Sequence, residues 1–123
     1  MSLVSVVMPM RNTEAYIRES IRSVLDEHDV PLEVVVVNDG STDGSAEIVQ
    51  SINDDRVRMI DGPVQGIASC VNAGLETARG DIFMRCDSDD TFAAGRVAQQ
   101  SRWLEKHHDF GAVCGSFHTV DAG

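Results

Sequence analysis

The sequence contains little cysteine and no closely spaced cysteine pair. Its three cysteines, Cys70, Cys86 and Cys114, lie far apart, and no CxxC motif occurs. A zinc knuckle needs paired ligands at short spacing and a disulfide framework needs an even set, so neither is indicated. The four histidines also lack the spacing of a metal site. We therefore expect reduced, mostly buried thiols, as in a cytoplasmic protein.

Long hydrophobic runs are missing as well. The longest aliphatic run is Val34 to Val37, whereas a membrane-spanning helix needs about 20 apolar residues. The N-terminus has no basic region ahead of an apolar stretch, so no secretory signal is predicted. These two absences agree with the cytoplasmic location that the cysteines favour.

Basic residues are scarce. The chain has 10 lysines and arginines against 20 acids, which gives a net charge of −10, and Lys106 is its one lysine. This charge repels phosphate backbones and anionic membranes, so nucleic acid is not expected as a partner. The motifs GxGxxG, GxxxxGK[ST] and GxSxG are all absent, which argues against a dinucleotide turn, a P-loop and a hydrolase nucleophile elbow.

What the 123 residues do contain is a regular alternation of strands and helices. With 42% apolar and 24% charged residues, the composition is that of one globular domain. Strands are predicted over 3–8, 34–37, 57–60, 82–86 and 112–116, and helices over 14–27, 46–52, 67–78 and 95–107. Such alternation predicts an α/β fold of three α/β/α layers around a mainly parallel, Rossmann-like sheet.

Several local features follow from this pattern. Thr13 is expected to cap the first helix, whose buried stripe is predicted to be Ile17, Ile21, Val24 and Leu25. Gly80 is expected to end the third helix in a left-handed conformation. The third helix itself is predicted from the helical spacing of Ile67, Val71, Gly74, Leu75 and Ala78.

Ligands of parallel α/β sheets bind outside the carboxyl ends of the strands. In this sequence those ends are followed by three polar loops, which are 9–13, 38–45 and 87–91. The function of the chain is therefore sought in these loops.

The loop Asp87-Ser88-Asp89-Asp90 concentrates carboxylates at a strand end. Neighbouring carboxylates repel one another unless a cation joins them, and Mg²⁺ or Mn²⁺ takes one or two protein carboxylates together with substrate phosphates. An acidic protein could bind a nucleoside diphosphate in this way. The alternative is a solvated acidic turn that caps the next helix.

In the loop over 38–45, Asp39 directly follows the buried strand, and its carboxylate can accept a hydrogen bond from a base or a ribose. We interpret 41–45 as a turn plus a helix cap. The spacing Asp39-x-Ser41-x-Asp43-Gly44 resembles the start of a calcium loop. Gln50 stands at its twelfth position in place of the bidentate glutamate, so that interpretation fails.

Five segments together resemble the family 2 glycosyltransferases of the GT-A fold. They are Val4-Ser5-Val6-Val7-Met8-Pro9-Met10-Arg11-Asn12, Glu33 through Asp43, Gly66 with Asn72-Ala73-Gly74-Leu75, Ala78-Arg79-Gly80-Asp81, and Asp87-Ser88-Asp89-Asp90. Each segment is a weak signal, but five in order across nearly the whole chain are specific.

The resemblance implies a nucleotide-diphospho-sugar donor, with a UDP-sugar favoured, and Mn²⁺ or Mg²⁺ as cofactor. It implies transfer of the sugar, with inversion, to the hydroxyl of an unknown saccharide, lipid or protein acceptor. The donor site would consist of Pro9, Met10, Arg11, Asn12, Glu14, Asp39 and Asp87. The metal would be held by Asp89 and Asp87, which are also the implied catalytic residues.

The chain departs from the family pattern in three places. Arg11 follows Met10 where many members have a tyrosine after a small apolar residue, and Val71 replaces an arginine, which leaves fewer cationic phosphate contacts. No catalytic base can be assigned, because the family carries it in a later half, and Asp121 lies too near the terminus.

We therefore expect residues 1–123 to be one nucleotide-sugar-binding domain, truncated on its acceptor side, of an enzyme in the cytoplasm or at the inner face of the membrane. An open sheet edge would favour a homodimer. The alternative is a non-catalytic nucleotide-sugar-binding module or inactive fragment on the same fold. A nucleotidyltransferase is disfavoured because a basic glycine-rich loop is missing.

Overall fold

The computed structural model describes residues 3–106. In chain order the elements are β1 (Val4–Met10), α1 (Ile17–Leu25), β2 (Leu32–Asn38), α2 (Ser45–Ser51), β3 (Val57–Asp61), α3 (Ile67–Thr77), β4 (Ile82–Arg85) and α4 (Arg96–Lys106). The predicted alternation is confirmed over this range. The predicted strand 112–116 and the predicted helix end at His107 lie outside the described residues.

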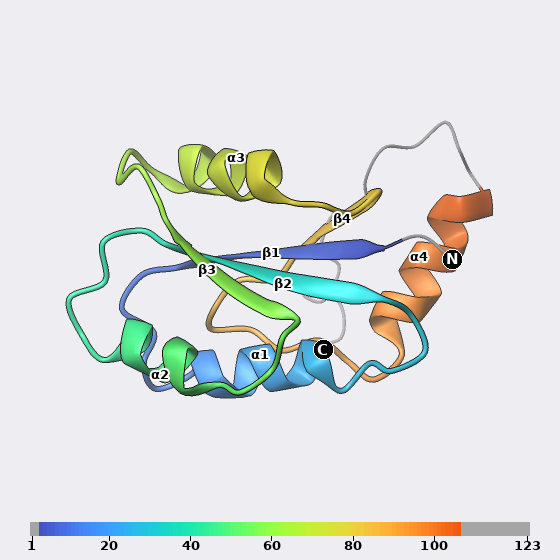
Figure 1. The fold of residues 1–123 in the computed structure, drawn as a ribbon, viewed down its shortest axis with the longest axis horizontal. Coiled ribbons are helices and arrows are strands. Elements are labelled where there is room, and N and C mark those ends of the chain that lie inside the picture. Colours follow the sequence, from blue (N-terminus) through green and yellow to red (C-terminus); the bar gives the residue numbers. More distant parts are fainter. Residues whose placement is uncertain (1–2, 107–123) are drawn as a thin grey trace.

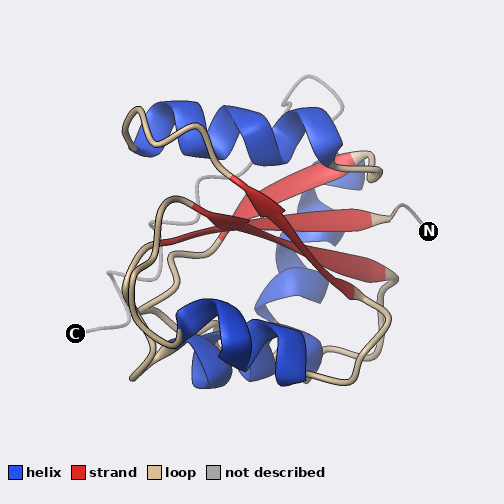
Figure 2. Cartoon of the chain, turned by 60° about the vertical axis from the view of Figure 1, so that its left-hand side comes forward, coloured by secondary structure: helices blue, strands red, loops and turns tan. Residues whose placement is uncertain are grey.

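The four strands form one sheet in the order β3-β2-β1-β4, and all three pairings are parallel. In the register, Val6 of β1 lies opposite Val34 of β2 and Met84 of β4. Helix α3 covers one face of the sheet, and α1, α2 and α4 lie on the other (Figures 1 and 2). The three-layer α/β/α prediction is therefore confirmed. No helix in the described range is both long and apolar enough to cross a bilayer.

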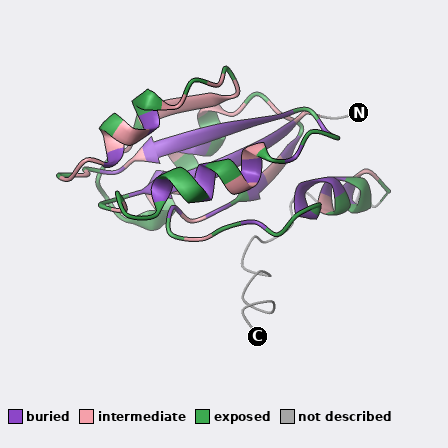
Figure 3. Cartoon of the chain, turned by 90° about the horizontal axis from the view of Figure 1, so that it is seen from below, coloured by how far each residue is buried: buried purple, intermediate pink, exposed green. Residues whose placement is uncertain are grey.

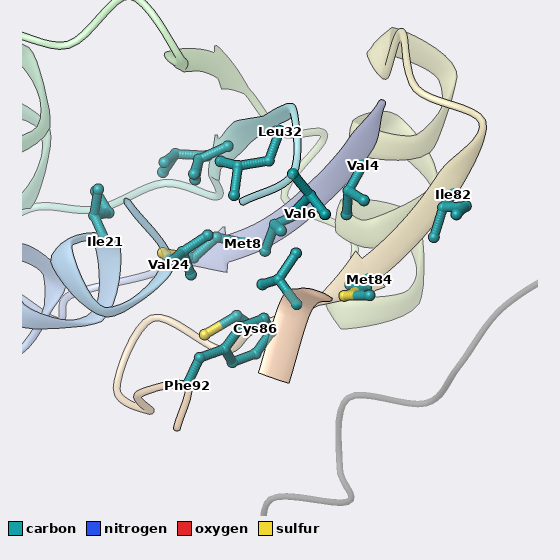
Figure 4. Packing of buried hydrophobic residues seen from close by; sticks show 14 of the residues in the cluster. Val4, Val6, Met8, Ile21, Val24, Leu32, Ile82, Met84, Cys86 and Phe92 are labelled. Atoms are coloured by element: carbon teal, nitrogen blue, oxygen red, sulfur yellow. The ribbon is translucent and has the colours of Figure 1, made fainter. Parts of the chain in front are cut away.

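The larger core lies between the sheet and the helices α1, α2 and α4. Alternate residues of β1, including Val4, Val6 and Met8, meet α1 there (Figure 4). The predicted stripe of α1 is confirmed, because Ile17, Ile21 and Val24 are fully buried and Leu25 is partly buried. In Figure 3 strands β1 and β2 are buried along most of their length and β3 is partly exposed, whereas the helices have exposed outer sides. Burial of these aliphatic side chains is the main force that holds the layers together.

The smaller core lies under α3, and the helix predicted there is confirmed. Cys70 and Gly74 are buried against the sheet, while Ile67 is 53% and Leu75 37% exposed. A Cβ atom on Gly74 would lie 2.5 Å from Cγ1 of Val7. The helix therefore packs its small residues on the sheet at close range. Apolar periodicity predicted the helix but not its inward side, because it gives weight to large side chains and here the small ones face inward.

Gly80 has a different role from the one predicted. Helix α3 ends at Thr77, and Gly80 is not among the residues with positive φ. A Cβ atom there would lie 2.5 Å from the carbonyl oxygen of Leu3 and 2.6 Å from Oγ of Ser5. Glycine is needed for close backbone approach to β1, so the predicted left-handed helix end was wrong.

The predicted cap of α1 was also wrong. The helix begins at Ile17, and its first turn has no side-chain cap. The carbonyl oxygen of Thr13 accepts hydrogen bonds from the amides of Tyr16 and Ile17, at 2.9 and 2.8 Å. The Thr13 hydroxyl instead donates to Oγ of Ser88 at 2.9 Å. A tertiary hydrogen bond has therefore replaced the local cap.

Candidate functional site

A cavity of about 310 Å³ opens at the carboxyl ends of β1, β2 and β4. The chain runs from β1 to β2 and β3 on one side, and then crosses to β4 on the other side of β1. Ligands of open α/β sheets bind at such a reversal of strand order. The cavity is lined by Pro9, Met10, Arg11, Thr13, Asp39, Ile67, Cys70, Arg85, Asp87, Ser88 and Asp89.

Three carboxylates gather at one side of this cavity. Asp87, Asp89 and Asp90 each offer an oxygen, and these three oxygens lie within 4.8 Å of one another. Oxygen donors of this kind and spacing fit a hard divalent cation such as Mg²⁺ or Mn²⁺. The residues present therefore fit the cofactor that the sequence predicts.

The acidic loop is fastened to the helix beneath it. The hydroxyl of Ser20 donates to the carbonyl oxygen of Ser88 at 2.8 Å, and the amide of Phe92 donates to Oγ of Ser23 at 2.9 Å. The hydroxyls of Ser88 and Thr13 are also joined, as described above. These bonds hold the carboxylates in place on a rigid support, as a binding site requires.

Asp39 lies elsewhere on the cavity wall and is only 7% exposed. Its amide donates to the carbonyl oxygen of Met10 at 2.8 Å, which ties the ends of β1 and β2 together. Its Oδ1 accepts a 2.8 Å hydrogen bond from the amide of Val64. Val64 has a φ of 55°, which is rare for a β-branched residue. A locally strained loop thus supplies the donor that orients the Asp39 carboxylate.

Of the predicted donor-site residues, Asn12 and Glu14 do not line the cavity. Asn12 has a φ of 53°, and its Oδ1 accepts hydrogen bonds from the amides of Thr42 and Asp43 at 2.7 and 3.3 Å. The amide of Glu14 donates to Oδ2 of Asp43 at 3.2 Å. The loops after β1 and β2 are therefore joined directly to each other.

The segment 41–45 has the local bonds of a turn. Oδ1 of Asn38 accepts from the amide of Ser41 at 3.1 Å, and Oδ1 of Asp43 accepts from both the amide and the hydroxyl of Ser45. The Ser45 hydroxyl is the main cause that lowers the pKa of Asp43. These contacts agree with the interpretation of this segment as a turn that leads into α2.

Sequence reasoning missed several cavity residues, which are Thr13, Ile67, Cys70, Arg85 and Ser88. Arg85 is the last residue of β4, and its Nε donates to Oδ1 of Asp87 at 2.9 Å. A cation at the end of a strand, two positions before an acidic cluster, was a signal available in the sequence. The inward side chains of α3 had no such signal, because small residues face the sheet there and apolar periodicity gives them little weight.

The two described cysteines are both buried. Burial raises the pKa of Cys86 to about 12, with further contributions from Asp90 and Asp87. Burial and the Asp39 carboxylate raise the pKa of Cys70. Both thiols are therefore protonated at neutral pH and act as packing groups, Cys70 in the wall of the cavity and Cys86 in the larger core.

Comparison with known proteins gives one consistent result. Residues 5–123 match the profile of Glycosyl transferase family 2. An uncharacterized glycosyltransferase of Haemophilus influenzae is 38% identical over 111 residues, covering 88% of this chain and 44% of that protein. Chondroitin synthase of Pasteurella multocida is 41% identical over 90 residues, covering 72% of this chain and 9% of that protein.

Solved structures agree with these relatives. TarS 1-349 of S. aureus in complex with UDP-GlcNAc superimposes with a TM-score of 0.76 at 31% identity, covering 85% of this chain and 32% of that chain. The mannosyltransferase PcManGT of Pyrobaculum calidifontis, in complex with GDP-Man and Mn²⁺, gives 0.76 at 29% identity, covering 84% and 32%.

The chain spans less than half the length of these relatives. The similarity nevertheless extends over almost all of its own residues and includes the three loops that form the cavity. The fold is of the GT-A type, and the chain belongs to glycosyl transferase family 2.

Proposed function

We propose that this chain is the donor-binding part of a glycosyltransferase that takes a nucleotide-diphospho-sugar through a divalent cation and transfers the sugar, with inversion, to an acceptor hydroxyl. The observation that carries the proposal is the cavity at the carboxyl ends of β1, β2 and β4. It brings Asp39 and the acidic pair Asp87 and Asp89 to one open space. The complexes of TarS with UDP-GlcNAc and of PcManGT with GDP-Man and Mn²⁺ support this class of donor and cation.

In this proposal the base of the nucleotide lies against Pro9, Met10 and Arg11 and donates a hydrogen bond to the Asp39 carboxylate. Asp39 is suited to that role because it is buried and is held on both sides by backbone contacts. A buried, oriented acceptor discriminates well, since a ligand without the matching N–H leaves it unpaired. A UDP-sugar is the favoured donor, as the resemblance to the family implies, and the TarS complex with UDP-GlcNAc supports this preference.

Asp87 and Asp89, with Asp90 beside them, would hold Mn²⁺ or Mg²⁺. When bound, such a cation neutralises the negative charge that grows on the departing nucleoside diphosphate. The protein's own contribution is to keep these carboxylates in place through the bonds of Ser88 to Thr13 and Ser20.

Neither the acceptor surface nor the catalytic base is assigned to a residue of this chain. We propose that residues 1–123 form one domain of a longer enzyme, with the acceptor surface and the base contributed elsewhere in that enzyme. A homodimer through an open sheet edge is part of the same proposal, since β3 has a neighbour on one side only within the described sheet. The cytoplasmic location proposed from the sequence rests on the cysteines, of which Cys70 and Cys86 are buried and free.

Calorimetric titration of UDP into the chain, with and without Mn²⁺, tests the proposal. We expect binding that Mn²⁺ strengthens. Asp89→Ala should reduce the affinity to the value measured without metal, and Asp39→Ala should weaken binding about tenfold through the lost charged hydrogen bond. Asp55→Ala, at an exposed turn before β3, is the matched control and should bind like the parent.

Absence of UDP and GDP binding under all these conditions would contradict the proposal. Binding without release of UDP from any UDP-sugar, in an enzyme that includes the acceptor half, would instead favour a non-catalytic nucleotide-sugar-binding module.

A further inference from the structure

Among the described residues that line the cavity, Arg85 forms an ion pair with the acidic cluster. Its Nε donates to Oδ1 of Asp87 at 2.9 Å, and the two side chains are 44% and 40% exposed. Within residues 3–106 the terminal nitrogens of this guanidinium make no hydrogen bond. The Arg85 side chain therefore has unused donors at the wall of the proposed donor site.

The position of Arg85 is set by the sheet. It lies opposite Val7 in the pairing of β4 with β1, so it points to the face that α3 covers, whereas the next residue, Cys86, points to the opposite core. Its charge acts on Cys70 of α3, whose pKa it lowers against the larger effect of burial. Arg85 therefore lies between the acidic loop and α3 on the wall of the cavity.

Asp87 has two candidate partners that compete electrostatically. It is one of the three carboxylates whose oxygens fit a divalent cation, and it is also the partner of Arg85. A divalent cation and a guanidinium on one carboxylate repel each other, so binding of the cation weakens the hold of Asp87 on Arg85. The guanidinium released from Asp87 would lie next to the position at which the diphosphate of the nucleotide would bind the cation.

We propose that Arg85 is a donor-binding residue that pairs with Asp87 and moves to the diphosphate of the nucleotide when cation and donor bind. The inference rests on the proposed function. A planar guanidinium suits this exchange, because it binds carboxylate and phosphate oxygens in the same forked geometry. Arg85 would also supply a phosphate contact that Val71, which replaces an arginine of the family pattern, cannot make.

The exchange predicts two effects of opposite sign in Arg85→Gln. Mn²⁺ alone should bind about two- to fivefold more tightly, because its competitor for Asp87 is gone and an exposed pair of this kind is weak. UDP in the presence of saturating Mn²⁺ should bind about tenfold more weakly, because a charged hydrogen bond to phosphate is lost. Uridine, which has no phosphate, should bind equally to both proteins.

The measurements are Mn²⁺ binding by electron paramagnetic resonance and nucleotide binding by calorimetry, on protein whose thermal unfolding matches the parent. Arg79→Gln removes the same charge at an exposed position near the opposite end of β4 and is the matched control, expected to change neither affinity. Arg85→Lys keeps the charge but not the fork and should recover part of the UDP affinity.

If Arg85 has a purely structural role, Arg85→Gln should lower the affinities for Mn²⁺ and for UDP together, and that result would overturn the inference. The inference would also be overturned if Arg85→Gln left either affinity unchanged, or if neither the parent nor the variant bound Mn²⁺ detectably. Failure of the parent chain to bind either UDP or GDP would contradict the proposed function itself, which separates the two outcomes.

Discussion

The hydroxyl of Thr13 donates a 2.9 Å hydrogen bond to the hydroxyl of Ser88, across 75 positions of sequence. The bond joins the loop after β1 to the acidic loop after β4, and both residues line the cavity. The two loops, each of which also bonds to other segments, are thus linked directly to each other beside the carboxylates.

Replacement of Thr13 by valine tests this connection. The substitution keeps the shape of the side chain but leaves the buried Ser88 hydroxyl without its donor, so the free energy of unfolding should fall by about 1 kcal/mol. Mn²⁺ affinity should fall severalfold, because the acidic loop is less well held. Urea unfolding and Mn²⁺ titration measure the two effects. Thr91→Val, at an exposed loop position, is the control, and an equal loss in that variant would contradict the explanation.

Gly62 is expected to control the orientation of Asp39. A Cβ atom at this position would lie 2.7 Å from Oδ1 of Asp39 and 3.0 Å from Cγ1 of Val37. Gly62→Ala should therefore displace the carboxylate and weaken UDP binding about tenfold, while Mn²⁺ alone binds as before. Calorimetry of both ligands checks this, with Asp61→Asn at the neighbouring exposed residue as control. A parallel loss of Mn²⁺ affinity would indicate general unfolding of the site instead.

A buried carboxylate under α3 should make stability depend on pH. Burial raises the pKa of Glu33, but hydrogen bonds from the Arg79 amide, Ser5 and Arg58 outweigh it and hold the pKa below the ordinary value of 4.5. The charged form is therefore favoured in the folded state. Its stabilisation is complete above the unfolded pKa and is lost as the pH falls through the lower, folded pKa.

Glu33→Gln should accordingly lower the free energy of unfolding by about 2 kcal/mol at pH 7, and the difference from the parent should shrink below pH about 4. Urea unfolding at a series of pH values measures it. Glu76→Gln, on the exposed side of α3, should have little effect at any pH. If the difference in the free energy of unfolding between the parent and Glu33→Gln stays constant down to pH 3, the charge of Glu33 is not what stabilises the fold.

The buried thiols should resist alkylation. Since burial raises the pKa of Cys86 to about 12 and also raises that of Cys70, almost no thiolate forms at pH 8. Peptide mapping after iodoacetamide treatment should find both residues unmodified in the folded chain and modified in urea. Labelling of Cys86 at the rate of an unfolded thiol would contradict its placement under the acidic loop.

The strands and their parallel pairing could be predicted from the sequence because the strands carry strong and independent signals. Val34 to Val37 is continuous and aliphatic, as expected for a strand covered on both faces. Once the strands are parallel, their carboxyl ends share one edge, so Asp39 and Asp89 could be expected near one cavity from sequence position alone.

What could not be predicted depends on contacts between distant segments. Thr13 was assigned to a local cap, but its hydroxyl bonds to another loop. Gly80 was assigned a special φ, but the reason for glycine there is the nearness of the Leu3 carbonyl. The inward side of α3 depends on how closely Gly74 approaches Val7. Local patterns describe one segment at a time and do not contain these distances.

The side-chain amide of Asn12 has a practical consequence for redesign of the site. Because the Oδ1 of Asn12 accepts from the backbone of 42–43 while the backbone amide of Asn12 donates to Oγ of Ser41, the loops after β1 and β2 share one set of hydrogen bonds. A chimera that took only one of these loops from a relative would break bonds on both sides. To transfer the donor specificity of a relative to this chain, both loops should therefore be exchanged together.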